Sequence, residues 1–346
     1  MKNRKRLHEI DGIRTVAISL VVLSHYTKEF FPQHRLLSFG WSGVDLFFVI
    51  SGFILYYQVK KRYYRDGNTL YIDYLRNRAL RIIPAYYVSV IVTLLFFGKD
   101  KFLTFIFPLH LTFLYIFDYD VAMSIQPLYW TLAVEVQFYI FLIIFAPFLT
   151  GKNSMKWILS LIIMNLLYRM AFPLFYNASS NSGLVLGNIL PGRISEFSYG
   201  MIIARIYLGE KGLMNKLRKG LYIIITAILS FLCIAICWSA WLKMGDSVLD
   251  HWLINIIYYP LVGLGFALFF LLVLISPGLN RFMSLRPVAF IGTISYSIYL
   301  WHMLALKLVK DVLADAGGFL ITLIATLILS TISYYLIERT FLRFKT

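Results

Sequence analysis

Three ionisable residues, Asp11, Arg14 and His25, lie in the first apolar stretch of the chain. At about 100° per residue, the steps from Arg14 to His25 leave a net rotation of roughly 20° on an α-helix, and Asp11 lies about 40° to the other side of His25. All three therefore share one helix face. Ionisable groups are costly in a membrane and normally turn toward a protein interior or a wet cavity. One interpretation is a reactive site along this face; the other is two interfacial charges and a hydrogen-bonded core histidine.

The composition of the 346-residue chain indicates which elements carry these residues. Hydrophobic residues make up 60% and charged residues 14%, whereas a soluble domain is nearer half apolar and about a quarter charged. We therefore predict an all-α polytopic membrane protein that lies in the lipid bilayer. No recognition module accompanies the net charge of +16, so nucleic acid is not an expected partner. The two cysteines, Cys233 and Cys237, lie one turn apart in an apolar segment, and neither a disulfide nor a metal is expected.

About ten segments are apolar over the roughly 20 residues that a helix needs to cross a bilayer. They are residues 12–31, 41–59, 80–97, 128–149, 157–175, 189–207, 221–241, 252–275, 288–309 and 318–337. Residues 102–117 form a shorter apolar segment that contains a proline and a histidine. We interpret it as a re-entrant or an interfacial piece.

The distribution of basic residues supports ten spans with both termini in the cytoplasm. With this topology, 23 of the 33 Lys and Arg residues lie on the inner side and nine on the outer side, as the positive-inside rule expects. Counting residues 102–117 as a full span would place the basic residues 205–219 outside. The connections are too short for a core of their own. Residues 1–346 are therefore predicted to form one integral membrane domain of the cytoplasmic (inner) membrane, with no appended soluble domain.

This topology sorts the ionisable residues by depth, at about 1.5 Å per residue. The expected outer half holds His25, Asp45, Glu135, Arg193, Glu196 and His302, and the inner rim holds Arg14, Arg76, Arg78 and Arg81. Guanidinium groups bind phosphate oxygens bidentately, whereas histidine and carboxylates suit proton transfer. The inner rim is therefore predicted to bind a phosphate-bearing ligand, and the outer half to transfer protons to or from an acceptor.

Simpler interpretations accompany several of these residues. Arg78 and Arg81 also fit plain topology anchors, because every cytoplasmic loop carries such residues. His302 also fits a core histidine bonded to a backbone carbonyl. For Glu135, a functional role or an ion pair is favoured, because a carboxylate within a span is expensive.

Several motifs, taken in order along the chain, resemble the membrane-bound acyltransferase 3 family. Arg14 followed by His25 resembles its opening motif. Further resemblances are residues 43–53 with Asp45 and Ser51, residues 78–84 with Arg78 and Arg81, residues 130–139 with Trp130, Glu135, Gln137 and Tyr139, residues 193–200 with Arg193 and Glu196, residues 295–302 with His302, and residues 337–339. Together these motifs cover nearly the whole chain. The set is therefore specific for this family, although no single motif is specific on its own.

The resemblance implies transfer of an acyl group, most often acetyl from acetyl-CoA, to a hydroxyl of a cell-surface or exported glycan. It implies that His25 is the general base or relays the acyl group, and Glu135 is the carboxylate expected to share the catalysis. The CoA phosphates are expected at Arg14, Arg78 and Arg81, with no metal. The other motif residues are expected to bind substrate or support the site: Asp11, Asp45, Ser51, Trp130, Gln137, Tyr139, Arg193, Glu196 and His302.

The chain departs from the family pattern in two ways. Val136 stands where the family usually has a second Glu, and Ala133 where it has a Ser, so a role that needs two adjacent acids is not expected. Many members also carry an extracytoplasmic esterase-like domain after the spans. Here the sequence ends at Thr346, so we expect the membrane unit or an extracytoplasmic partner to complete the transfer.

Two other functions remain open at this stage. The same fold could acylate a lipid-linked or small-molecule acceptor, since the residues do not separate these acceptors from a glycan. A transporter or flippase would use the same histidine and glutamate as a proton relay, although the paired broken helices typical of such proteins are not evident. A purely structural scaffold gives no reason to bury His25 and Glu135.

Overall fold

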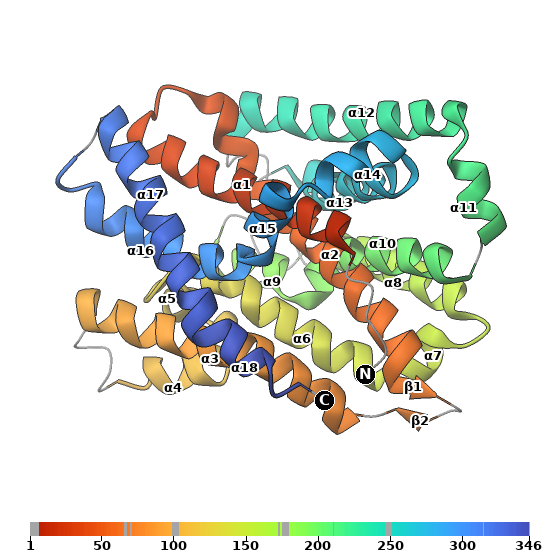
Figure 1. The fold of residues 1–346 in the computed structure, drawn as a ribbon, viewed down its shortest axis with the longest axis horizontal. Coiled ribbons are helices and arrows are strands. Elements are labelled where there is room, and N and C mark those ends of the chain that lie inside the picture. Colours follow the sequence, from red (N-terminus) through yellow and green to blue (C-terminus); the bar gives the residue numbers. More distant parts are fainter. Residues whose placement is uncertain are drawn as a thin grey trace.

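A computed structural model describes residues 7–65, 68–69, 71–98, 104–171, 174, 180–209, 211–245, 251–313 and 315–345. The chain forms a helical bundle with α12 along one edge of the view and α3 toward the opposite edge (Figure 1). In the described part, β-structure is confined to an antiparallel hairpin of β1 (Tyr64–Arg65) and β2 (Asn68–Thr69). The predicted all-α class is confirmed apart from this hairpin.

Helices occur at each of the ten apolar segments predicted from the sequence. The long helices are α1 (His8–Phe30), α2 (Gly43–Gln58), α3 (Tyr71–Phe97), α6 (Trp130–Ile144), α8 (Ser154–Ala171), α10 (Leu190–Gly209), α12 (Gly220–Met244), α13 (Trp252–Ile275), α16 (Ser295–Val309) and α17 (Ala316–Ser333). The shorter helices are α4 (Ile106–Leu111), α5 (Tyr119–Met123), α7 (Ala146–Thr150), α9 (Asn181–Asn188), α11 (Lys211–Leu217), α14 (Pro277–Met283), α15 (Arg286–Thr293) and α18 (Arg339–Leu342).

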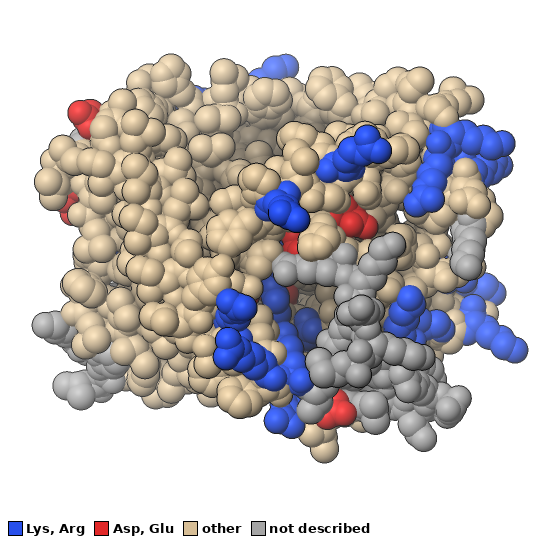
Figure 2. Space-filling view, viewed as in Figure 1, with Lys and Arg blue, Asp and Glu red and all other residues tan. Residues whose placement is uncertain are grey.

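The outer helices present apolar side chains, as expected for contact with lipid. In α12 and in the segment that contains α17, only 17% and 22% of the most apolar window is buried. Figure 2 shows wide areas without charged side chains, while Lys and Arg gather over α11 and α18. By length and composition, six helical segments of the described chain could cross a membrane, or seven with one bent pair included. The protein is therefore a multi-pass membrane protein, and the number of ten spans stays a prediction.

Two predicted spans are not single straight helices. In residues 288–309, α15 and α16 meet at an angle of 67°, because Ile294 leaves the helical conformation at φ −91° and ψ 6°. Gly292, two residues earlier, packs directly on α1: a Cβ there would lie 1.6 Å from the carbonyl oxygen of Asp11. In residues 128–149, Phe145 separates α6 from α7. Each of these two apolar segments thus holds two helices, a division that the apolar pattern alone did not indicate.

Two further boundaries differ from the prediction or refine it. Helix α3 begins at Tyr71, ahead of the predicted start at residue 80, so Arg76, Arg78 and Arg81 are helical. In residues 102–117, α4 and a 3₁₀ turn (Leu114–Phe117) are separated by Phe113, whose φ is +61°. No continuous helix crosses the described part of that segment, and residues 102–103 lie outside the described residues.

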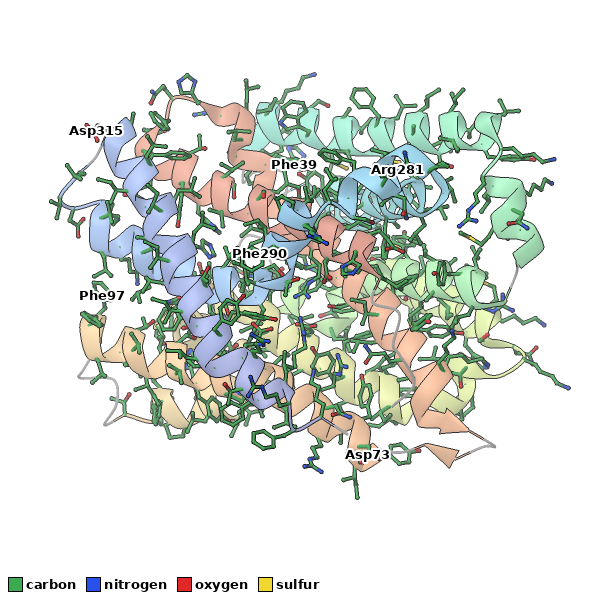
Figure 3. The ribbon with its side chains drawn as sticks, in the orientation of Figure 1. Phe39, Asp73, Phe97, Arg281, Phe290 and Asp315 are labelled. Atoms are coloured by element: carbon green, nitrogen blue, oxygen red, sulfur yellow. The ribbon has the colours of Figure 1, made fainter. Side chains whose placement is uncertain are left out.

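The ends of several helices can be followed in Figure 3. Phe97, at the C-terminal end of α3, and Asp315, which caps the start of α17, lie on the left of the view. Asp73, in the first turn of α3, and Arg281, in α14, lie to the right of the centre. The bundle therefore has two ends, and α3 runs from one to the other.

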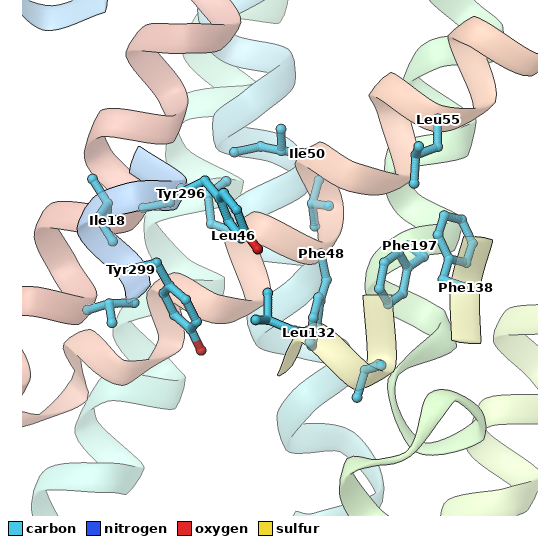
Figure 4. Close-up of a cluster of buried hydrophobic side chains, with 14 of the residues drawn as sticks. Ile18, Leu46, Phe48, Ile50, Leu55, Leu132, Phe138, Phe197, Tyr296 and Tyr299 are labelled. Atoms are coloured by element: carbon cyan, nitrogen blue, oxygen red, sulfur yellow. The ribbon is translucent and has the colours of Figure 1, made fainter. Parts of the chain in front are cut away.

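The centre of the bundle is the crossing of α2 and α10. A Cβ on Gly52 would lie 2.1 Å from the carbonyl oxygen of Phe197, and one on Gly200 would lie 2.0 Å from a carbonyl oxygen of α2. Small residues allow such close approach between membrane helices. The ring of Phe197 stacks between Phe48 at 4.8 Å and Phe138 at 4.1 Å (Figure 4). Helices α2, α6 and α10 thus form one packed unit, against which the site is built.

Candidate active site

Two cavities lie toward opposite ends of α1. The arginine cavity, of about 920 Å³, is lined by Asp11 and Arg14 from the first half of the helix. The histidine cavity, of about 620 Å³, is lined by His25 and Lys28 from the second half. Both volumes are in the range of small-molecule sites. The one face of α1 predicted to carry chemistry therefore contributes to two sites.

The arginine cavity carries an excess of positive charge. Its described lining includes five cations, Arg14, Lys61, Arg78, Arg81 and Lys345, against two acids, Asp11 and Glu135. Among the described residues, Arg14 and Arg78 make no salt bridge, and Arg81 lies 4.0 Å from the carboxylate of Glu338. Arg78 donates a hydrogen bond to Gln58 and is only 8% exposed. Guanidinium groups without carboxylate partners suit a phosphate-bearing ligand.

Glu135 belongs to the arginine cavity. Its Oε1 accepts hydrogen bonds from the Ser51 hydroxyl at 2.9 Å and the Tyr139 hydroxyl at 2.7 Å, which joins α2 to α6. The sequence analysis placed Glu135 and His25 in the same outer half, and the structure puts them in the linings of different cavities. Trp130 lines the histidine cavity, but Thr131 already lines the arginine cavity. Glu135 follows Thr131 by about one helical turn, and each residue of α6 adds about 1.5 Å of rise away from the histidine cavity.

The partner of His25 in the histidine cavity is His302 of α16. The Nδ1 atom of His302 lies 2.9 Å from the carbonyl oxygen of Tyr299 and 3.1 Å from that of Ile298. Carbonyl oxygens only accept, so this Nδ1 carries a proton, and Nε2 of the neutral ring is an acceptor. Nε2 lies 3.3 Å from Nδ1 of His25, which donates to it. In neutral His25, Nε2 is then left as the proton acceptor.

Tyr299 and Val44 line both cavities and form the boundary between them. The hydroxyl of Tyr299 donates to the carbonyl oxygen of Leu128 at 2.7 Å and accepts from the Thr131 hydroxyl at 2.6 Å. Figure 4 shows the Tyr299 side chain beside Tyr296 of the same helix. Tyr299 is therefore the polar side chain that the described linings of the two cavities share.

A buried network of charges stands behind the histidine cavity. Arg193 lies 2.8 Å from Asp45 and 3.3 Å from Glu196, and each of these side chains is at most 2% exposed. The guanidinium lies over the rings of Tyr259 at 3.8 Å and Trp130 at 5.3 Å. The structure therefore brings these predicted residues together, but only Arg193 and Trp130 of them line the cavity.

Gln137 lies apart from both cavities. Its Oε1 accepts from the backbone N–H of Leu190 at 2.9 Å, so it supports the start of α10. Sequence reasoning missed Arg169, which is fully buried and bonds to Asn255 and to the carbonyl oxygen of Gly192. A single arginine in the apolar segment 157–175 was the available signal. It also missed Ser295, which lines the arginine cavity with its hydroxyl unpartnered among the described residues.

Comparison with known proteins identifies the family. The family model for the acyltransferase 3 group, described as an acyltransferase domain, matches residues 7–338. O-acetyltransferase OatA of Staphylococcus aureus (strain NCTC 8325 / PS 47) is 27% identical over 98% of this chain and 57% of the relative. Putative peptidoglycan O-acetyltransferase YrhL of Bacillus subtilis (strain 168) is 26% identical over 95% of this chain and 54% of the relative.

The chain thus spans little more than half the length of these relatives. No solved structure gives a significant match. The family match covers nearly the whole chain and includes the segments that build both cavities, Asp11 to His25 and Trp130 to Tyr139 among them. The chain belongs to the acyltransferase 3 family, which confirms the resemblance seen in its motifs.

Proposed function

We propose that this protein is an O-acetyltransferase of the cytoplasmic membrane. It transfers the acetyl group of acetyl-CoA, bound at the arginine cavity, to a hydroxyl of a cell-wall or exported glycan at the histidine cavity. The observation that carries this proposal is the pair of cavities on α1 that meet at Tyr299. The printed names of the two relatives support the acetyl group, and the name of YrhL supports a peptidoglycan acceptor.

The topology proposed is ten spans with both termini in the cytoplasm. Leu7 and Lys345, close to the two ends of the chain, both line the arginine cavity, which agrees with an even number of spans. Phe97 and Asp315, predicted to face outward, lie on one side of Figure 3, away from Asp73 and Arg281, which are predicted to face inward. The arginine cavity then opens to the cytoplasm, where acyl-CoA is available, and the histidine cavity opens to the outside.

The donor is proposed to place its phosphates at Arg14, Arg78 and Arg81. Arg14 and His25 are separated by roughly 16 Å along the helix axis, at about 1.5 Å per residue. The long flexible arm of CoA separates its phosphates from the thioester, so the donor can hold both positions. Glu135, with Ser51 and Tyr139, then lies beside this arm. We therefore assign Glu135 to the binding of the donor. We assign His302 as the residue that acts together with His25.

The proposed chemistry uses the free Nε2 of His25. This nitrogen removes the proton of the acceptor hydroxyl while the oxygen attacks the thioester carbon. The C–O bond forms, the C–S bond breaks, and the proton passes to the departing thiolate. A two-step route, in which Nε2 first takes the acetyl group and then gives it to the hydroxyl, uses the same nitrogen.

The test is acetyl transfer by the purified protein in lipid nanodiscs. Radiolabelled acetyl-CoA and a peptidoglycan disaccharide are supplied, and the ester product is counted. We expect His25→Ala to lose about 10³-fold in rate, within the range of general-base catalysis, while its affinity for acetyl-CoA stays that of wild type. Undiminished transfer by this variant would overturn the proposal. Mass spectrometry of the protein quenched in acid without acceptor separates the two routes, since only one leaves acetyl on His25.

A further inference from the structure

In the described part of the chain, the mouth of the histidine cavity holds two cations, Lys28 and Arg35, beside the imidazole of His34. Among its described lining residues there is no Asp or Glu, while Lys28, His34 and Arg35 are exposed and make no salt bridge with described residues. Arg193, the other arginine of the described lining, is already paired with Asp45 and Glu196 behind the wall. Charges of one sign at a cleft concentrate ligands of the opposite sign.

A neighbouring lysine shows the contrast. Lys310 is half-buried, and its Nζ lies 3.1 Å from the carboxylate of Glu29. Glu29 directly follows Lys28, but its carboxylate is engaged away from the cavity. Lys28 faces the histidine cavity and has no salt-bridge partner among the described residues, whereas Lys310, outside the cavity lining, has one.

The basic segment that follows α1 is held against α12. The indole N–H of Trp238 donates to the carbonyl oxygen of Leu36 at 3.1 Å, and that of Trp241 donates to the Ser38 hydroxyl at 3.0 Å. The Ser38 hydroxyl in turn donates to the carbonyl oxygen of Arg35 at 2.6 Å. Arg35 is thus the first residue of a tied 3₁₀ segment, and its backbone position is fixed relative to the cavity.

The inner walls of the cavity are aromatic. The Trp41 ring lies 5.2 Å from Trp241 and 5.9 Å from Tyr259, and all three line the cavity. The Nε1 of Trp41 is buried and has no hydrogen-bond partner among the described residues. Flat apolar faces suit the C–H faces of a sugar, and the free indole N–H is a donor. Carboxylates, which would accept from the hydroxyls of a neutral sugar, are absent from the described lining.

We infer that Lys28, His34 and Arg35 form a subsite for an anionic group, a carboxylate or a phosphate, carried by the acceptor glycan. The inference rests on the proposed function and narrows its substrate class to anionic glycans. Lys28 follows His25 by about one helical turn, roughly 5 Å of rise. The anionic group therefore lies on the acylated sugar or on its direct neighbour.

The test measures acceptor binding to the full-length protein in detergent micelles, without an acyl donor. The probes are matched pairs: an N-acetylglucosamine–N-acetylmuramic acid disaccharide with its carboxylate free or as the methyl amide, and N-acetylglucosamine with or without a 6-phosphate. We expect the anionic member of at least one pair to bind at least tenfold more tightly. The pair that shows the difference identifies the source of the charge. Equal affinity within both pairs would overturn the inference.

The matched variants are Lys28→Gln with Arg35→Gln, and Lys307→Gln as control. Lys307 lies on the same predicted side of the membrane but does not line the cavity. The double variant should lose the preference for the anionic probe, and the control should keep it. An equal loss in the control would assign the effect to overall charge and overturn the subsite. Thermal unfolding of each variant checks that the fold is intact.

Acetyl transfer, measured separately, distinguishes the two proposals. Charge-dependent binding without any transfer contradicts the O-acetyltransferase function and leaves the anionic subsite standing. Transfer with charge-independent binding contradicts only the subsite.

Discussion

Two groups of arginines in the cavity walls use their charge in opposite ways. In the wall of the histidine cavity, Arg193 is closed in by Asp45 and Glu196 and is 2% exposed. In the arginine cavity, Arg14 and Arg78 line the open space and make no salt bridge among the described residues. Charges that already have partners join helices, and charges without partners are available to a ligand. This contrast separates the structural residues from the binding residues among those with the same chemistry.

Removing one partner of the buried network should give the largest effect, on stability. Asp45→Asn leaves the buried Arg193 with a single carboxylate, and breaking such a pair costs about 3–5 kcal/mol. The matched control is Glu29→Gln in the exposed pair with Lys310, where about 0–1 kcal/mol is expected. The free energy of unfolding in detergent measures both. A similar small loss in the two variants would contradict the structural role of the network.

Replacing His302 should give the next largest effect, a fall in kcat. His302→Ala removes the acceptor that orients Nδ1 of His25, and we expect kcat to fall by about 100-fold, part of the general-base contribution. His302→Gln presents an amide oxygen to the same N–H and should recover part of the rate. The KM for acetyl-CoA should not change in either variant, because the proposed site of the donor phosphates is the arginine cavity. An equal loss in both variants would assign His302 to packing alone.

Arg78 and Arg76 form a matched pair for the arginine cavity. They lie two positions apart on α3, but Arg78 is buried and lines the cavity, whereas Arg76 is exposed and does not. Arg78→Ala should raise the KM for acetyl-CoA by about 10-fold or somewhat more, as expected for a charge-assisted hydrogen bond, with kcat nearly unchanged. Arg76→Ala should leave both constants unchanged. If both variants raise KM equally, the two arginines act as topology anchors.

A variant of Tyr299 tests the role of the boundary between the two cavities. It should give the smallest effect on kcat. Tyr299→Phe removes the hydroxyl bonded to Leu128 and Thr131. We expect kcat to fall by about 3- to 10-fold, the equivalent of one hydrogen bond, with both KM values unchanged. Tyr296→Phe is the control, since Tyr296 lines only the arginine cavity and its hydroxyl bonds to Ile82. A larger effect in Tyr296→Phe would place the passage of the acyl group elsewhere.

Local features of this protein could be predicted from the sequence because they depend on near neighbours. The helical period aligned Arg14 with His25, and apolar length located all ten helical segments. The pairing of His25 with His302 could not be predicted, since the residues are 277 positions apart and no spacing rule connects them. The same holds for the bend at Ile294, which depends on the packing of Gly292 against α1. Counting residues along an ideal span also could not show that Glu135 lines the cavity of Arg14 and not that of His25, because the extent of each cavity depends on the packing of distant helices.

The glycine contacts between α2 and α10 have a mechanical consequence. With Gly52 against the backbone of α10 and Gly200 against that of α2, the two helices cannot slide past one another without a clash. We expect them to move together, with Val44 of α2 and Arg193 of α10, which line the histidine cavity. A rocking-bundle cycle that opens the two cavities in turn would have to separate this contact. We therefore expect the proposed transfer to proceed with α2 and α10 held in place relative to one another.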